Sequence, residues 1–122
     1  ELLKVRSTKD ENLIYTWTKD LCLGDVCEKN AQLRPHIVWF GEDVPMMQVA
    51  GKIVAKADIF IVVGTSLVVY PAAGLVHYTD FTVPKYVIDP NKPSISFMQN
   101  SEYITEIASI GVGILVDRLM NE

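Results

Sequence analysis

The run Ile59–Val63 constrains the fold more than any other stretch, because its five consecutive apolar residues are all β-branched or aromatic. Such residues favour strands, and the lack of polar alternation predicts a strand buried on both faces, as in the middle of a parallel sheet. The run ends at Gly64, and Thr65 and Ser66 follow it. Because ligands bind beyond the carboxyl ends of such strands, this turn is either an ordinary connection or a contact for phosphate and sugar oxygens.

Composition limits the class of protein. With 122 residues, of which 49% are hydrophobic and 21% charged, the chain is globular. A net charge of −4 without a basic stripe argues against direct binding to nucleic acid, and no apolar run reaches the roughly 20 residues that span a membrane. Two cysteines make no disulfide framework, which favours a cytoplasmic location. The first residues read as the inside of a structural element, so we expect a part of a longer protein.

A second all-apolar run, residues 37–40, predicts another strand, which ends at Gly41 and Glu42. Residues 46–57 carry apolar side chains at helical spacing, and Asp43 and Pro45 are placed to begin that helix as N-cap and first-turn residue. The strand, this helix and the strand at 59–63 would form a right-handed βαβ unit.

The rest of the chain alternates between short elements and turns. The sequence predicts a short helix from Pro71 toward Tyr78, a loop over 94–101 and an amphipathic helix near the C-terminus. Strands are expected at these places: 1–5, 13–17, 85–88 and 103–107. The fold class is therefore α/β, with a parallel sheet in residues 36–122 and a small loop-rich module in residues 1–35.

Three predicted strands end in residues suited to ligand binding. Their ends are Gly41-Glu42, Gly64-Thr65-Ser66 and Asp89-Pro90-Asn91, and in a parallel sheet they would share one edge. In nucleotide folds, an acidic residue about 20 positions beyond a glycine turn often binds ribose hydroxyls, and Asp89 stands 25 positions after Gly64. The alternative is that Asp89 is only a turn residue before Pro90.

Two long segments resemble the signatures of the sirtuin family. Residues 33–42, Leu-Arg-Pro-His-Ile-Val-Trp-Phe-Gly-Glu, resemble the segment in which Arg-Pro leads a strand ending in Phe-Gly-Glu. Residues 64–73, Gly-Thr-Ser-Leu-Val-Val-Tyr-Pro-Ala-Ala, resemble the second signature at suitable spacing. The details look most like bacterial sirtuins, and the resemblance covers essentially the whole chain but only the second half of the family.

The resemblance implies an NAD-dependent protein-lysine deacylase, a transferase that moves the acyl group to ADP-ribose and releases nicotinamide. Residues 36–122 would then be the C-terminal half of the Rossmann-like NAD-binding domain. Contacts to NAD would come from Gly64, Thr65, Ser66, Asp89, Pro90, Asn91 and Ala108. Val112 would pack near Ala108, and at Asp89 the family usually has Asn.

The resemblance also implies a place for the acyl-lysine peptide. The matching residues are Val38, Phe40, Gly41 and Glu42. The peptide would bind by strand addition, with its lysine in an apolar tunnel lined by Phe40. The alternative for Phe40 is ordinary sheet packing.

This chain departs from the family pattern in two ways. The catalytic His-Gly pair would precede Glu1, and neither His36 nor His77 replaces it, so the isolated chain is predicted to be inactive without the N-terminal half of the protein. The family's two Cys-x-x-Cys zinc pairs would fall on Ser7 and Asp10 and on Cys27 and Asn30.

Because structural zinc needs four good ligands, we expect no zinc, and the module would depend on a mini-core. Its residues would be Leu13, Tyr15, Trp17 and Leu21. Two other functions stay open. One is a non-catalytic NAD or ADP-ribose-binding module, and the less favoured one is a metal-ribbon interaction domain around Cys22 and Cys27.

Overall fold

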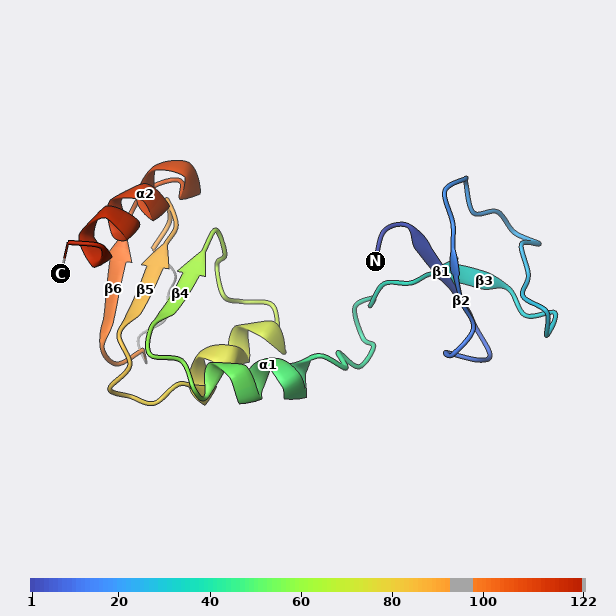
Figure 1. Ribbon diagram of the computed structural model, residues 1–122, viewed down its shortest axis with the longest axis horizontal. Coiled ribbons are helices and arrows are strands. Elements are labelled where there is room, and N and C mark those ends of the chain that lie inside the picture. The colour runs from blue at the N-terminus through green and yellow to red at the C-terminus, as the bar shows by residue number, and fades with distance from the viewer. Residues whose placement is uncertain (93–97, 122) are drawn as a thin grey trace. The chain divides into compact units, whose positions relative to one another are not determined.

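The computed structural model describes residues 1–92 and 98–121, and the chain divides into two compact units, Glu1–Asp43 and Val44–Glu122 (Figure 1). Each unit has its own sheet. Residues 36–43 make their contacts within the first unit, although the sequence predicts that they belong with the second.

The first unit is built on a three-stranded antiparallel sheet with the order β2-β1-β3. Its strands are β1 (Lys4–Ser7), β2 (Ile14–Thr16) and β3 (Leu33–Pro35). The buried residues of its core are Val5, Cys27, Ala31 and Leu33. All four members of the predicted mini-core pack against them, so that prediction is confirmed.

The second unit confirms the predicted α/β class with a parallel sheet. The strands β4 (Phe60–Val63), β5 (Lys85–Ile88) and β6 (Ser101–Ile104) pair in the order β4-β5-β6. The helices among the described residues of this unit are α1 (Met47–Val54), the 3₁₀ helix η1 (Ala72–Tyr78) and α2 (Ala108–Leu119). No helix in the described ranges is long and apolar enough to cross a membrane.

Both faces of the parallel sheet carry a small core. On one face, Val62 and Val87 pack with Val76 of η1 and with Met98. On the other face, Ile88 and Ile104 pack with Leu115 of α2. Val87 and Ile88 are neighbours in β5, and successive strand residues point to opposite faces, so η1 and α2 cover opposite sides.

The predicted strand at 37–40 is wrong, and so is the predicted βαβ unit. These residues form no strand, whereas Leu33–Pro35 pairs with β1. The amide of His36 donates to the carbonyl of Lys4 at 2.9 Å, and the backbone then leaves the antiparallel sheet. An apolar run becomes a strand only where a partner strand accepts its hydrogen bonds.

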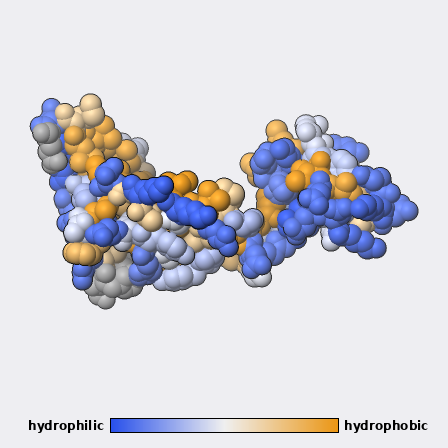
Figure 2. All heavy atoms as spheres, turned by 60° about the horizontal axis from the view of Figure 1, so that its bottom comes forward, coloured by the Kyte–Doolittle hydropathy of each residue, from blue (hydrophilic) through white to orange (hydrophobic). Residues whose placement is uncertain are grey.

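The prediction that β4 is buried on both faces is also wrong. β4 is the edge strand of the sheet among the described residues, and Ile61 and Val63 on one face are 46% and 40% exposed. Similar apolar side chains reach the surface elsewhere in the molecule (Figure 2).

Some predicted boundaries also shift. α1 begins after Met46 without a side-chain cap, so Asp43 is not its N-cap, and Pro45 precedes the helix. β6 begins at Ser101 rather than at residue 103. The predicted loop over 94–101 lies partly outside the described residues.

Candidate functional site

The carboxyl ends of β4, β5 and β6 meet at one edge of the parallel sheet, as their parallel arrowheads show (Figure 1). The register pairs Val63 with Ile88 and Ile88 with Ile104. Beyond these pairs, the amide of Gly64 donates to the carbonyl of Ile88 at 2.9 Å, and the amide of Asp89 donates to that of Ile104 at 3.3 Å. Gly64 and Asp89 therefore follow the ends of neighbouring strands and lie side by side.

The turn after β4 has the backbone form that only glycine adopts without cost. Gly64 has φ +64°, and a Cβ built there would meet nothing within 4 Å. Its surroundings are open, so the glycine serves the backbone or a ligand and not packing. Thr65 and Ser66 are exposed, and Oγ1 of Thr65 accepts a hydrogen bond from the amide of Leu67 at 3.1 Å.

Asp89 has the turn role that the sequence left open as an alternative. Its Oδ1 accepts a hydrogen bond from the amide of Asn91 at 2.8 Å, which bends the chain around Pro90. The residue is half-buried, and Pro90 and Asn91 are exposed. The turn role and a ribose contact are compatible, because a carboxylate can accept several hydrogen bonds.

Ala108 is the first residue of α2 and lies shortly after the end of β6. The N-cap residue Ile107 makes no side-chain hydrogen bond to the helix, and no acidic residue stands in the first turn. A helix start of this kind carries a partial positive charge and unsatisfied backbone donors. Val112 lies one turn further and is 37% exposed. The end of β6 therefore adds a third ligand-compatible segment to this edge.

Gly41 and Glu42 do not follow a strand of the parallel sheet. The prediction that they share its edge with the residues after β4 and β5 is therefore wrong. They lie in the first unit, after the irregular segment 36–40. Gly41 has φ +87°, and Phe40 before it is 92% exposed. Val38 is also exposed, so neither apolar side chain packs in a core of its unit. The ordinary-packing alternative for Phe40 is therefore wrong in this unit.

The carboxylate of Glu42 is the centre of a network in the first unit. Both of its oxygens accept hydrogen bonds from the guanidinium of Arg34, with Nη2 and Oε2 3.1 Å apart. Oε2 also accepts from the amide of Trp39 at 3.0 Å and lies 3.7 Å from Nη2 of Arg6. The hydrogen bond from Arg34 is the main reason why the pKa of Glu42 lies below its usual value. Sequence reasoning treats Glu42 as a substrate contact and misses this network, which depends on tertiary closeness.

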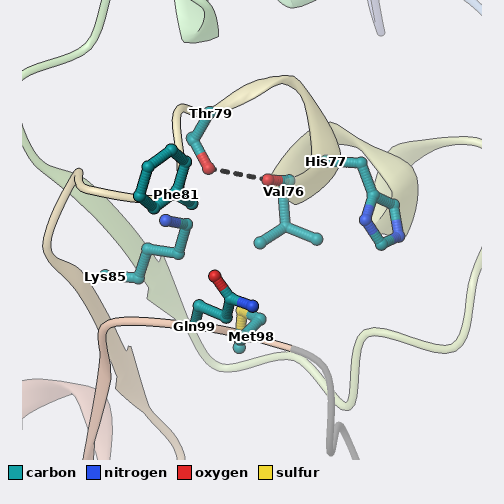
Figure 3. Close-up of a pocket in the computed structure, with 7 residues that line it drawn as sticks. All are labelled: Val76, His77, Thr79, Phe81, Lys85, Met98 and Gln99. Atoms are coloured by element: carbon teal, nitrogen blue, oxygen red, sulfur yellow. Dashed lines mark hydrogen bonds between the residues drawn. The ribbon is translucent and has the colours of Figure 1, made fainter.

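A cavity of about 160 Å³ lies at the opposite end of the parallel sheet, where β5 begins (Figure 3). Its lining residues are Val76, His77, Thr79, Phe81, Lys85, Met98 and Gln99. Lys85 is buried, and its ammonium donates to the carbonyls of Asp80 and Val83 at 2.9 Å each. No predicted NAD or peptide residue lines this cavity.

No group of three or more His, Cys, Asp or Glu side chains suited to a metal occurs in the described part of the chain. Cys22 is exposed and Cys27 is buried, where its Sγ lies 3.3 Å from Oγ of Ser7. We expect elemental analysis of the purified chain to find no zinc, and chelation to leave its thermal unfolding unchanged. Near-stoichiometric zinc would contradict this prediction.

Comparison with known proteins gives consistent matches. A model of the Sir2 family matches residues 4–71. An NAD-dependent protein deacylase of Helicobacter pylori strain J99 is 46% identical over 120 residues, which cover 98% of this chain and 51% of that protein. The crystal structure of a Sir2 homolog–NAD complex has a TM-score of 0.79 at 28% identity and covers 98% of this chain and 48% of that chain.

An ADP-ribose complex of a mutant Sir2 homologue is similar too, with a TM-score of 0.73, 28% identity and coverage of 98% of this chain and 48% of that chain. The chain spans about half the length of the curated relatives it matches.

Proposed function

The chain belongs to the Sir2 family, and on that premise we propose that it is part of an NAD-dependent protein-lysine deacylase of the bacterial type. Such an enzyme transfers the acyl group of a protein lysine to ADP-ribose and releases nicotinamide. This chain would supply part of the NAD site and part of the acyl-lysine peptide cleft. The NAD-dependent deacylase activity of the Helicobacter relative supports the enzyme class.

The observation that carries the NAD assignment is the shared sheet edge. It brings together the left-handed turn at Gly64, the carboxylate of Asp89 and the start of α2 at Ala108. These residues fit NAD, because the space beside Gly64 is open and backbone donors of the first helical turn suit phosphate oxygens. Thr65, Ser66, Pro90 and Asn91 would complete the contacts. NAD, when bound, supplies the ADP-ribose acceptor and the nicotinamide leaving group.

The peptide would bind along residues 38–41. This segment has no strand partner among the residues that the structure describes, and its apolar side chains are exposed. A segment without a partner strand and with flanking apolar side chains suits strand addition by an extended peptide. In this proposal Val38, Phe40 and Gly41 contact the peptide, and Phe40 lines the lysine tunnel.

We propose no catalytic residue within this chain. His36 is half-buried at the end of β3, and His77 lines the cavity at the far end of the sheet. The catalytic histidine and the rest of the NAD site would come from the N-terminal half of the same protein. The cytoplasmic location expected from the cysteine usage stays a prediction.

The test is the release of nicotinamide from NAD in the presence of an acyl-lysine peptide. We expect the full-length gene product to release nicotinamide and the 122-residue chain to release none. Activity of the 122-residue chain would refute the placement of the chemistry outside it. If the full-length product bound NAD but released no nicotinamide, the alternative of a non-catalytic NAD or ADP-ribose-binding module would be correct.

Replacing Asp89 by asparagine should improve the use of NAD. The amide keeps an acceptor for the Asn91 N–H, and the change removes a negative charge near the proposed phosphates. Because a charge that water partly screens contributes no more than about 1 kcal/mol, we expect the KM for NAD to fall by about two- to fivefold. Asp58→Asn is the control, because it removes the same charge from the exposed residue before β4, at the opposite end of the strand. Equal effects of the two variants would argue against Asp89 as an NAD contact.

A further inference from the structure

The segment proposed to receive the peptide is held in place by one side-chain pair. The guanidinium of Arg34 faces the carboxylate of Glu42 across the loop and bonds to both of its oxygens. This two-pronged geometry is specific to arginine and fixes orientation as well as distance. The Arg34 side chain is 23% exposed and that of Glu42 33%, so water screens the pair only in part.

The same pair also fixes the backbone between its two members. Oε2 of Glu42 accepts from the amide of Trp39 at 3.0 Å, and Nη2 of Arg34 donates to the carbonyl of Ile37 at 3.4 Å. The amide of Glu42 donates to the carbonyl of Trp39 at 3.1 Å. The guanidinium lies 5.9 Å from the centre of the Trp39 ring. In this segment, which pairs with no strand of the described residues, the ion pair and one backbone hydrogen bond thus fix the conformation.

The pair rests on a rigid base. Arg34 belongs to β3, where it is the register partner of Arg6 in β1. Arg6 adds a second positive charge beside Oε2 of Glu42, at 3.7 Å. Phe40 and Gly41 lie between the anchored residues Trp39 and Glu42, and Phe40 is almost fully exposed.

We propose that Arg34 is a positioning residue for the acyl-lysine peptide, and that Glu42 acts through Arg34 rather than by touching the peptide. The inference rests on the proposed deacylase function and deepens it. The ion pair holds residues 38–41 in one solvent-facing conformation, with a turn at Phe40 and Gly41, before the peptide arrives. An incoming peptide then loses less affinity to the ordering of this backbone.

The test compares Arg34→Lys with wild type in the full-length gene product. Lysine keeps the positive charge but cannot make the two-pronged bond. We expect the KM for the acyl-lysine peptide to rise by about tenfold, with kcat and the KM for NAD within about twofold of wild type. The control is Lys29→Gln, which removes an exposed pair with Asp10 in the same unit and should leave all three constants unchanged.

A second variant separates positioning from direct contact. Glu42→Gln should raise the KM for the peptide as Arg34→Lys does, and the double variant should be no worse than either single one, because both break one interaction. If the KM for the peptide rose in Glu42→Gln but not in Arg34→Lys, Glu42 would touch the peptide directly, and the inference would be overturned. The inference would also be overturned if Arg34→Lys raised the KM for the peptide and the KM for NAD equally and lowered the thermal stability. An inactive wild-type protein overturns the deacylase function as well, whereas an active one with unchanged KM values overturns only the positioning role.

Discussion

Replacing Gly111 by alanine is expected to lower the free energy of unfolding by about 1–3 kcal/mol. A Cβ at this position would lie 2.4 Å from Cγ2 of Ile88 and 3.3 Å from Cβ of Glu106. Ile88 of β5 is fully buried against α2, so its methyl group has no free space to move into. Either the helix moves away from the sheet or the core repacks with strain. Alanine favours a helix by about 1 kcal/mol over glycine, and the clash outweighs that gain.

Gly113→Ala is the matched control for this prediction. Gly113 stands in the same helix, and a Cβ there would meet nothing within 4 Å. Without a clash, only the helix propensity acts, and we expect the variant to be more stable by about 0.5–1 kcal/mol. Urea unfolding of both variants measures the two effects with opposite signs. If Gly111→Ala were also stabilising, the close approach of α2 to β5 would be wrong.

The Gly111 contact also links the core to the proposed NAD edge. Gly111 lies one turn after Ala108, so a helix displaced from Ile88 takes its first turn away from the carboxyl ends of β5 and β6. Gly111→Ala should therefore raise the KM for NAD in the full-length gene product, while Gly113→Ala should not. The glycine thus serves packing and positions the start of the helix.

Two strands of the parallel sheet, β4 and β5, could be predicted from sequence because their signals are local. β5 was readable from an apolar run that Pro84 precedes and the pair Asp89-Pro90 ends. β4 was readable from its β-branched run, although its burial was not. Burial depends on which segments cover each face, and the sequence of one strand does not contain that information.

The irregular segment 37–40 shows the opposite case. Its composition favours a strand, but β1 pairs with Leu33–Pro35 instead, and Arg34 and Pro35 are weak strand formers. The carboxylate of Glu42 then takes the Trp39 amide that a partner strand would have used. Tertiary pairing and one side chain together overrode the local propensity, and only the three-dimensional structure contains them.

In the proposed sites, too, some residues could be proposed from the sequence and others depend on the fold. Gly64, Thr65, Ser66 and Asp89 could be proposed from the sequence because turn chemistry after a strand is a local pattern. Their common edge followed from the parallel pairing that the structure contains. The Arg34–Glu42 pair and the Gly111 contact could not be read from spacing, since each joins residues whose closeness depends on the fold.

Replacing Gly64 by alanine should weaken the use of NAD as well as the fold. A side chain at φ +64° costs about 1–2 kcal/mol of backbone strain, and no steric clash adds to this because the space is open. That open space is where the proposed phosphate or ribose oxygens would approach the backbone. We expect a rise in the KM for NAD of at least about tenfold, which corresponds to about 1.4 kcal/mol.

Gly24→Ala separates strain from ligand contact. Gly24 also has a positive φ, +96°, and open space around its Cβ, but it belongs to the first unit, whereas the residues of the proposed NAD edge belong to the second. Both variants should lose a similar amount of unfolding free energy, measured in urea, whereas only Gly64→Ala should raise the KM for NAD. If the two variants changed the KM for NAD equally, strain alone would explain the loss, and Gly64 would be an ordinary turn residue. If only Gly64→Ala raises the KM for NAD, the added methyl group occupies space that the bound NAD needs.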